Sequence, residues 1–293
     1  MEAYAALPSI GADAAAGKRA HVKTAFTIIL VAGAIAAGLK LLVLTLEPKA
    51  AFYPYPGEQE TPADARLPFE RVTIRTSDGE ALAAWWLPSA DPAPDILFFH
   101  GNGGNLSVWS DAIVGIRRRG WTVFALDYRG YGLSTGKPTE KGIYRDADAF
   151  LDEYWSRRHR KGRRVVYWGR SLGATVAAYA TMKRAPDALV LESPFASART
   201  LISDSPVTRI LGVFLSYRFP TTEFLHGYAG PALVVHGDAD RIVPLKHGRR
   251  VYEALGGPKT LHVIPGANHN DLHAVRPSVY WSALEAFVAG AAS

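Results

Sequence analysis

Residues 169–173 read Gly-Arg-Ser-Leu-Gly and lie between a β-rich run, 165–168, and a helical stretch, 171–183. A serine on a sharp strand-to-helix turn needs small flanking residues, because the backbone there is strained and closely packed. Such a turn exposes the hydroxyl at the amino end of the helix, where it can attack a carbonyl carbon. We therefore predict that Ser171 is a nucleophile. The simpler alternative is a serine that only caps the helix.

A neutral hydroxyl is a poor nucleophile, so Ser171 needs a basic histidine within hydrogen-bond reach. The chain has nine histidines. His100 and His236 each precede a glycine at the end of a predicted strand, which favours a role in the turn. His269 lies in the loop after the last predicted strand, and such a loop can deliver an imidazole to the serine. We predict His269 as the base, with His273 as the main alternative.

The imidazole needs a carboxylate that holds its tautomer and stabilises its charged form. Asp240 follows a predicted strand, 233–235, in the pattern His-Gly-x-x-Asp. Asp238 lies two residues earlier and could also reach the histidine, although a structural role in the turn would account for it. Asp271 is a third candidate, for which helix capping is a sufficient explanation. The residues alone leave the choice between Asp240 and Asp238 open.

Acyl transfer places negative charge on the carbonyl oxygen, and each donor aimed at that oxygen contributes about 2.7–4 kcal/mol. One donor is expected to be the amide of Leu172, the residue after the nucleophile. The other is expected in the loop 100–105, His-Gly-Asn-Gly-Gly-Asn, whose glycines allow close approach of the backbone. Asn102 is the predicted donor and Gly103 the alternative. A phosphate-binding loop is disfavoured because no Gly-Lys-Ser/Thr follows.

The elements that would position these residues alternate between short β-rich runs and helical stretches from residue 67 to the end, which is typical of an α/β sheet. Strands are predicted at 72–76, 81–86, 96–99, 122–126, 165–168, 189–191, 233–235 and 262–264. Helices are predicted at 105–118, 141–158, 171–183, 245–255 and 278–288. The candidate residues follow the C-terminal ends of strands, where α/β sheets place their sites. Residues 196–230 are predicted to form a small helical cap, with Ile210 and Leu211 among its apolar residues.

The N-terminal part has a different composition. Ala25–Leu46 is a 22-residue apolar stretch with one charge, Lys40, and as a helix of about 33 Å it could cross a bilayer core. We predict a signal anchor over 25–46, with residues 1–24 cytoplasmic and the catalytic domain outside, because basic residues precede the stretch. A cleaved signal peptide and a buried core helix are the alternatives. Five prolines between Glu47 and Pro68 predict an extended tether over 47–66.

Composition limits the remaining possibilities. The chain has 293 residues, of which 48% are hydrophobic and 20% charged, so residues 67–293 can form a globular catalytic domain. The absence of cysteine excludes disulfides, thiolate metal sites and cysteine nucleophiles. A net charge of +6 is a weak argument for nucleic acid, and no nucleic-acid partner is predicted. We predict neither a metal ion nor a cofactor.

From Ile96 onwards the chain resembles the α/β-hydrolase superfamily, and most closely its membrane-anchored serine hydrolases. The matching segments are 100–105, 127–132 (Asp-Tyr-Arg-Gly-Tyr-Gly), 169–173, 236–240 (His-Gly-Asp-Ala-Asp) and 268–271 (Asn-His-Asn-Asp), in the family's order. The resemblance implies a mostly parallel eight-stranded sheet with flanking helices. It also implies a triad in the order Ser, Asp, His, which favours Asp240 as the acid.

These observations predict a membrane-anchored serine hydrolase of α/β fold. Ser171, His269 and Asp240 would form its triad, and the amides of Asn102 and Leu172 its oxyanion hole. The expected substrate is a carboxyl ester or thioester of a lipid-like acyl chain, with an amide or peptide bond second. A non-catalytic ligand receptor or scaffold on the same fold is the alternative from another class.

Overall fold

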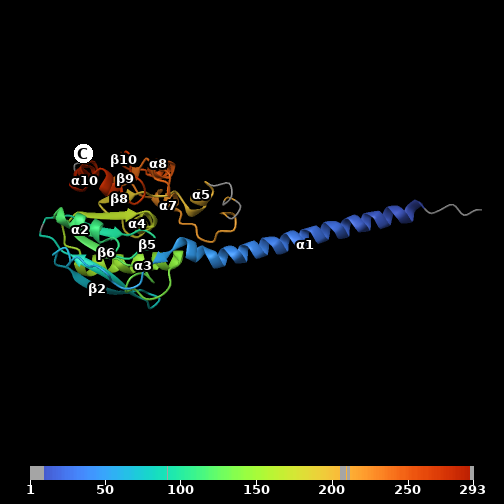
Figure 1. Cartoon of the computed structure of the whole chain (residues 1–293), viewed down its shortest axis with the longest axis horizontal. Coiled ribbons are helices and arrows are strands. Elements are labelled where there is room, and N and C mark those ends of the chain that lie inside the picture. Colours follow the sequence, from blue (N-terminus) through green and yellow to red (C-terminus); the bar gives the residue numbers. More distant parts are fainter. Residues whose placement is uncertain (1–9, 91, 205–208, 210–211, 291–293) are drawn as a thin grey trace, which may run out of the picture.

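The structure is a computed structural model that describes residues 10–90, 92–204, 209 and 212–290. A long helix, α1 (Ile10–Ala51), projects from an α/β domain that contains the other described residues (Figure 1). The C-terminal end of α1 meets the domain beside a short segment that carries α5 (Ala198–Ile202), as Figure 1 shows.

The domain is built on an eight-stranded sheet in the order β10-β9-β8-β7-β4-β6-β3-β2. Only β3 runs antiparallel to its neighbours, and all other adjacent pairs are parallel. The predicted sheet is thereby confirmed, and each predicted strand overlaps an observed one. The strands are β2 (Glu70–Arg75), β3 (Ala81–Leu87), β4 (Asp95–Phe99), β6 (Thr122–Leu126), β7 (Val165–Arg170), β8 (Ala188–Glu192), β9 (Ala232–Gly237) and β10 (Lys259–Ile264).

Helices cover both faces of this sheet, because the central strands are apolar on both sides. Leu97 and Phe99 of β4 join the core beneath α3, α4 and α8, whereas Ile96 and Phe98 join the core beneath α2 and α10. The main helices are α2 (Ser110–Arg118), α3 (Glu140–Glu153), α4 (Leu172–Lys183), α8 (Leu245–Ala254) and α10 (Pro277–Val288). The shorter elements are a π-helical turn (Tyr154–Arg158), α7 (Thr221–Leu225), α9 (Leu272–Val275), β1 (Tyr53–Pro54) and β5 (Gly103–Gly104).

One helix begins later than its sequence predicts. The stretch 105–118 was expected to be helical from Asn105, but α2 begins at Ser110. The Asn105 side chain instead donates to the carbonyls of Tyr55 and Gly57, and its oxygen accepts from the amide of Val108. These bonds favour a turn over a helix at this position.

Helix α1 contains the predicted membrane segment and extends beyond it in both directions. Its part from Lys23 to Ala51 is long and apolar enough to cross a membrane, and only 6% of its most apolar window is buried. Phe26, Ile29 and Leu30 each expose more than half of their surface. The alternative of a buried core helix is therefore wrong.

Residues 47–66 pack against the domain, so their interpretation as an extended tether is wrong. The amides of Tyr53 and Tyr55 donate to the carbonyls of residues 102 and 104, at 3.0 and 2.9 Å. Only alternate residues of a strand donate to a given neighbour, so Pro54 and Pro56 take positions at which no donor is needed. The prolines that suggested a tether are therefore compatible with a paired edge beside the loop 100–105.

The predicted cap, 196–230, contains α5 and α7 and is fixed to the domain at several points. Glu140 accepts hydrogen bonds from the amides of Arg218 and Phe219, at 2.7 Å each. Asp204 forms an ion pair with Lys246 at 2.7 Å and a 2.8 Å contact with the His247 ring. The predicted apolar residues Ile210 and Leu211 lie outside the described residues.

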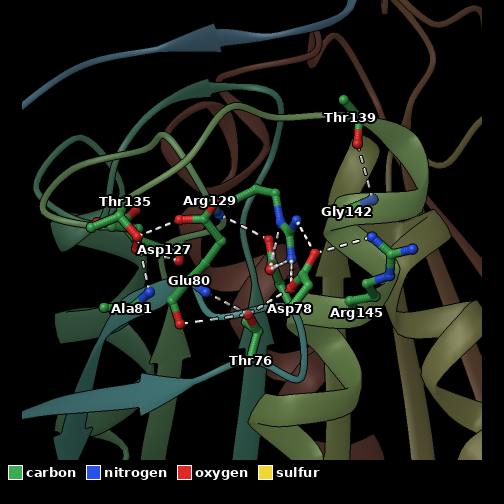
Figure 2. Close-up of polar contacts among 12 residues, drawn as sticks. Thr76, Asp78, Glu80, Ala81, Asp127, Arg129, Thr135, Thr139, Gly142 and Arg145 are labelled. Carbon is green, nitrogen blue, oxygen red and sulfur yellow. Dashed lines mark hydrogen bonds and ion pairs between the residues drawn. The ribbon is translucent and has the colours of Figure 1, made fainter.

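A partly buried ion-pair network fixes the loop that follows β6 (Figure 2). Arg129 contacts both Asp78 and Asp146 at 2.8 Å, and Arg145 contacts Asp78 at 3.0 Å. Burial raises the pKa of Asp146 to about 6, although the Arg129 contacts oppose that rise. The same loop carries Tyr131, whose hydroxyl donates to the carbonyl of residue 102 at 2.8 Å. The network thus supports the loop that holds the predicted oxyanion donor.

We expect Arg129→Leu to lower the free energy of unfolding by about 3–5 kcal/mol at pH 8, because it leaves the Asp146 carboxylate buried without its partner. The folded-state pKa of Asp146 lies above its unfolded value, so the Asp146 carboxylate of the folded protein binds a proton as the pH falls. The neutral carboxyl group then no longer carries the cost of an unpaired buried charge. The loss should therefore be smaller at pH 5. Urea unfolding at both pH values measures the loss in the free energy of unfolding. The control is Arg145→Leu, which removes an exposed ion pair and should lower the free energy of unfolding by less than about 1 kcal/mol. Equal losses at the two pH values would contradict this account.

Candidate active site

Ser171 lies on a sharp turn between β7 and α4, with a φ of 53° that a side-chain-bearing residue rarely adopts. Its two flanking glycines are required by close contacts. A Cβ on Gly169 would lie 2.2 Å from the carbonyl oxygen of Gly173, and a Cβ on Gly173 would lie 2.0 Å from that of Phe99. The Gly-x-Ser-x-Gly pattern therefore reflects packing of the turn against α4 and β4.

The structure brings together three residues that are distant in sequence. The Nε2 atom of His269 lies 3.0 Å from the Oγ atom of Ser171, and its Nδ1 atom lies 2.8 Å from Oδ2 of Asp240. All three residues are buried, with at most 9% of their surface exposed. This is the arrangement in which an imidazole can take a proton from a hydroxyl while a carboxylate holds the opposite ring nitrogen.

Asp240 is held in the ionised form by its surroundings. Its Oδ1 atom accepts hydrogen bonds from the amides of Ile242 and Val243, at 2.9 and 2.8 Å. Burial by itself would raise the pKa of Asp240, but hydrogen bonds from His236 and His269 outweigh burial and hold the pKa well below its usual value. The carboxylate can therefore stabilise a positive charge on the His269 ring.

The competing candidates have other partners. The ring of His236 contacts the carbonyl of Val243 at 2.7 Å and Asp240 at 3.4 Å, so it supports the acid instead of the nucleophile. The ring of His100 contacts a neighbouring carbonyl at 2.7 Å. Asp238 accepts from the amide of residue 266 at 2.7 Å, and Asp271 accepts from that of residue 268 at 2.6 Å. His273 lines a pocket beside Ser171, and its ring lies next to that of Tyr280, with 6.2 Å between the ring centres.

The predicted oxyanion donors, Asn102 and Leu172, line the same pocket as the nucleophile. Leu172 is the first residue of α4, so its amide has no acceptor within the helix. Asn102 and its alternative Gly103 both line the pocket that contains Ser171. The carbonyl of Asn102 is fixed by the Tyr131 hydroxyl and by the Tyr53 amide. The segment after α1 thus contributes directly to the position of this loop.

Arg170 was not singled out from the sequence. Its guanidinium donates to the carbonyl of His269 at 3.1 Å and lies over the Trp109 ring, 4.9 Å from the ring centre. Arg170 therefore ties the loop of the base to the strand of the nucleophile. No spacing signal could have revealed this, because the residue occupies the variable position of the Gly-x-Ser-x-Gly pattern.

Two pockets of different character meet at Ser171. One, of about 340 Å³, is lined by the polar side chains of Asp111, Arg170, His269 and His273 together with apolar ones such as Val108 and Trp109, and we call it the polar pocket. The other, of about 230 Å³, is lined mainly by apolar residues of the cap and of the end of α1. Ser171, Asn102 and Ile242 line both pockets, whereas His269 lines only the polar one.

Within the part of the chain that the structure describes, no three His, Asp or Glu side chains are grouped so as to hold a metal ion.

The strand order and the Ser171 turn define the chain as an α/β hydrolase in fold. The family model for the alpha/beta hydrolase fold matches residues 94–222. The chain is 33% identical over 276 residues to the alpha/beta hydrolase domain-containing protein WAV2 of Arabidopsis thaliana, covering 85% of this chain and 89% of that protein. It is 31% identical to an uncharacterized membrane protein of Saccharomyces cerevisiae, covering 78% and 82% of the two chains.

Among solved structures, the esterase Pf2001 of Pyrococcus furiosus is similar in fold, with a TM-score of 0.69 at 20% identity. The match covers 82% of this chain and 98% of that chain. The chain belongs to the α/β-hydrolase family.

Proposed function

We propose that the protein is a serine hydrolase that cleaves a carboxyl ester or thioester of a lipid-like acyl chain. The observation that carries this proposal is the continuous hydrogen-bonded line from Ser171 through His269 to Asp240. Proteins that only bind a ligand on this fold do not need that line, so its completeness favours catalysis over a receptor or scaffold.

In the proposed reaction the Oγ atom of Ser171 attacks the carbonyl carbon while Nε2 of His269 takes the hydroxyl proton. The oxygen of the tetrahedral intermediate accepts hydrogen bonds from the amides of Leu172 and Asn102. The bond to the leaving oxygen or sulfur then breaks, and His269 returns the proton to that atom. Water, deprotonated by His269, attacks the acyl-serine ester in the same way and releases the acid and the free hydroxyl.

The two pockets supply an orientation for the substrate. His269 must reach the leaving group to protonate it, and His269 lines only the polar pocket. We infer that the leaving group occupies the polar pocket, beside Asp111 and His273, and that the acyl chain occupies the apolar one. Burial of apolar surface in that pocket would contribute about 25 cal/mol per Å² to binding of the chain.

We also infer that α1 anchors the enzyme in a membrane. Ten large apolar side chains from Phe26 to Leu46 are exposed. Contact of these side chains with water is unfavourable, and a lipid environment would remove that cost. The yeast relative is itself named a membrane protein. Basic residues before the segment favour a cytoplasmic N-terminus and a catalytic domain outside.

The test is labelling of the full chain in detergent by a fluorophosphonate probe, which reacts with activated serines. We expect wild-type protein to be labelled and Ser171→Ala to be unlabelled, because the probe needs the activated Oγ atom. Ser193→Ala removes another buried serine and should leave labelling intact. Absence of Ser171-dependent labelling would favour a receptor or scaffold. Turnover of p-nitrophenyl esters, acyl thioesters and peptide amides would then identify the bond that is cleaved.

A further inference from the structure

Two charged side chains of α1 face the cap. The Nζ atom of Lys40 donates to the carbonyl of Phe214 at 2.7 Å and to the hydroxyl of Ser216 at 2.8 Å. The carboxylate of Glu47 accepts hydrogen bonds from the amides of Ser216 and Tyr217, at 2.8 and 2.6 Å. Lys40 and Glu47 are seven residues apart, which is two helical turns, so both lie on one face of α1.

These contacts fix the position of the cap on the helix. Glu47 exposes only 7% of its surface, and burial of a carboxylate is unfavourable unless hydrogen bonds replace its lost water. Both of its oxygens are used by amides of the cap. Charge-assisted hydrogen bonds of this kind are stronger than neutral ones. We call the contacts of Lys40 and Glu47 with residues 214–217 the helix–cap latch.

The same end of α1 forms a wall of the apolar pocket at Ser171. Ala50 and Ala51 line this pocket together with Leu201 and Leu215 of the cap, and Ser171 lies in the same lining. The lining residues with polar side chains are Glu47, whose carboxylate is hydrogen-bonded to the cap, Tyr217, and Asn102 and Ser171 of the proposed machinery. The pocket therefore offers a chain mainly apolar contacts along its walls.

The volume of the pocket limits how much of a chain it can hold. At about 230 Å³ it is smaller than the roughly 300–1,000 Å³ that encloses a drug-sized ligand. A long chain would therefore extend out of it. The turns of α1 directly before the pocket expose Leu41, Leu42 and Leu46, which are suited to contact with lipid.

We propose that the last turns of α1, Lys40–Ala51, are part of the acyl-binding site and that the chain of a bilayer-resident substrate enters the pocket between α1 and the cap. This inference rests on the proposed function. The membrane helix then acts as a specificity element as well as an anchor. The Lys40 and Glu47 side chains position the cap, whereas Ala50 and Ala51 contact the chain.

The first test narrows the pocket from the α1 side. The full chain is reconstituted into phosphatidylcholine vesicles, and turnover of p-nitrophenyl acetate and p-nitrophenyl palmitate is compared. Ala50→Trp should lower kcat/KM for palmitate at least about ten-fold more than for acetate, because the indole takes the space of several methylenes. Leu30→Trp, at an exposed position of α1 outside the proposed acyl-binding turns, should leave both rates near wild type. Equal effects of Ala50→Trp on the two esters would overturn the inference.

The second test releases the latch. Glu47→Ala should lower the palmitate-to-acetate ratio of kcat/KM at least about five-fold, and Glu47→Gln should recover part of it, because the amide oxygen still accepts a hydrogen bond. A merely structural role would lower both rates together without rescue of the ratio. The rate of fluorophosphonate labelling at Ser171 reports whether each variant retains a formed site.

The third test identifies the source of the chain. Palmitate ester placed in the same vesicles as the enzyme should be cleaved much faster than ester placed in separate vesicles. Equal rates would mean that the chain enters from water and would overturn entry from the bilayer. Acetate turnover that survives Ser171→Ala would refute the proposed function itself, whereas Ser171-dependent turnover with no chain-length effect would refute only the further inference.

Discussion

Replacing His269 with alanine is expected to lower kcat for a short activated ester by about 10⁶-fold, which is the scale measured for loss of the base in a comparable triad. The reason is that, among the described residues, the base in contact with the Ser171 hydroxyl is the His269 ring, whose Nε2 atom lies 3.0 Å away. Steady-state turnover of p-nitrophenyl acetate measures the loss. The matched control is His273→Ala, which removes a second imidazole from the same pocket and should change kcat less than about ten-fold.

The ranking of these two variants is the decisive readout. A larger loss in His273→Ala than in His269→Ala would mean that the hydrogen bond to Ser171 is not the one used in the reaction. In that case the loop after β10 would have to rearrange before catalysis.

Asp240→Asn is expected to lower kcat by about 10⁴-fold while the fold is retained. An amide is close in shape to the carboxylate, but it lacks the negative charge that stabilises a protonated His269 ring and can favour the wrong tautomer. The pKa of Asp240 is held well below its usual value by the hydrogen bonds of His236 and His269, which oppose the effect of burial. The wild-type carboxylate therefore stays ionised throughout the range in which turnover can be measured.

The control for this variant comes from the same loop. Asp238→Asn should change kcat less than about ten-fold, because the Asp238 carboxylate accepts a hydrogen bond from the amide of residue 266, whereas Asp240 is the carboxylate that contacts the His269 ring. Circular dichroism and thermal unfolding would establish that both variants are folded. A loss in Asp238→Asn that matched the loss in Asp240→Asn would contradict the assignment of the acid.

The sheet could be predicted from local sequence because the composition of its central strands reflects their burial on both faces. Residues 95–99 and 165–168 are nearly continuous apolar runs, as expected of strands covered on both faces. The candidate site could be predicted for a related reason. Each of its members occupies a turn directly after such a strand, and the chemistry of acyl transfer restricts which residue types can act there. The catalytic roles of Ser171, His269 and Asp240 stay predictions.

Contacts between distant segments could not be predicted in the same way. Lys40 and the carbonyl of Phe214 are separated by 174 residues, and nothing in the pattern of either segment indicates the other. The prolines of residues 47–66 indicate only that regular internal pairing is absent, and they are equally compatible with a free linker and a paired edge. Arg170 was missed because its contacts depend on the three-dimensional position of the His269 loop.

The meeting of an apolar and a polar pocket at one hydroxyl has a consequence for what happens after cleavage. With the proposed orientation, the released alcohol or thiol departs from the hydrated side, and water for the second half-reaction arrives by the same route once that side is vacated. The fatty acid stays on the side next to α1 and can return to lipid without crossing the aqueous phase. Such an enzyme would separate its two products into different phases in each turnover, so that neither product obstructs the exit of the other.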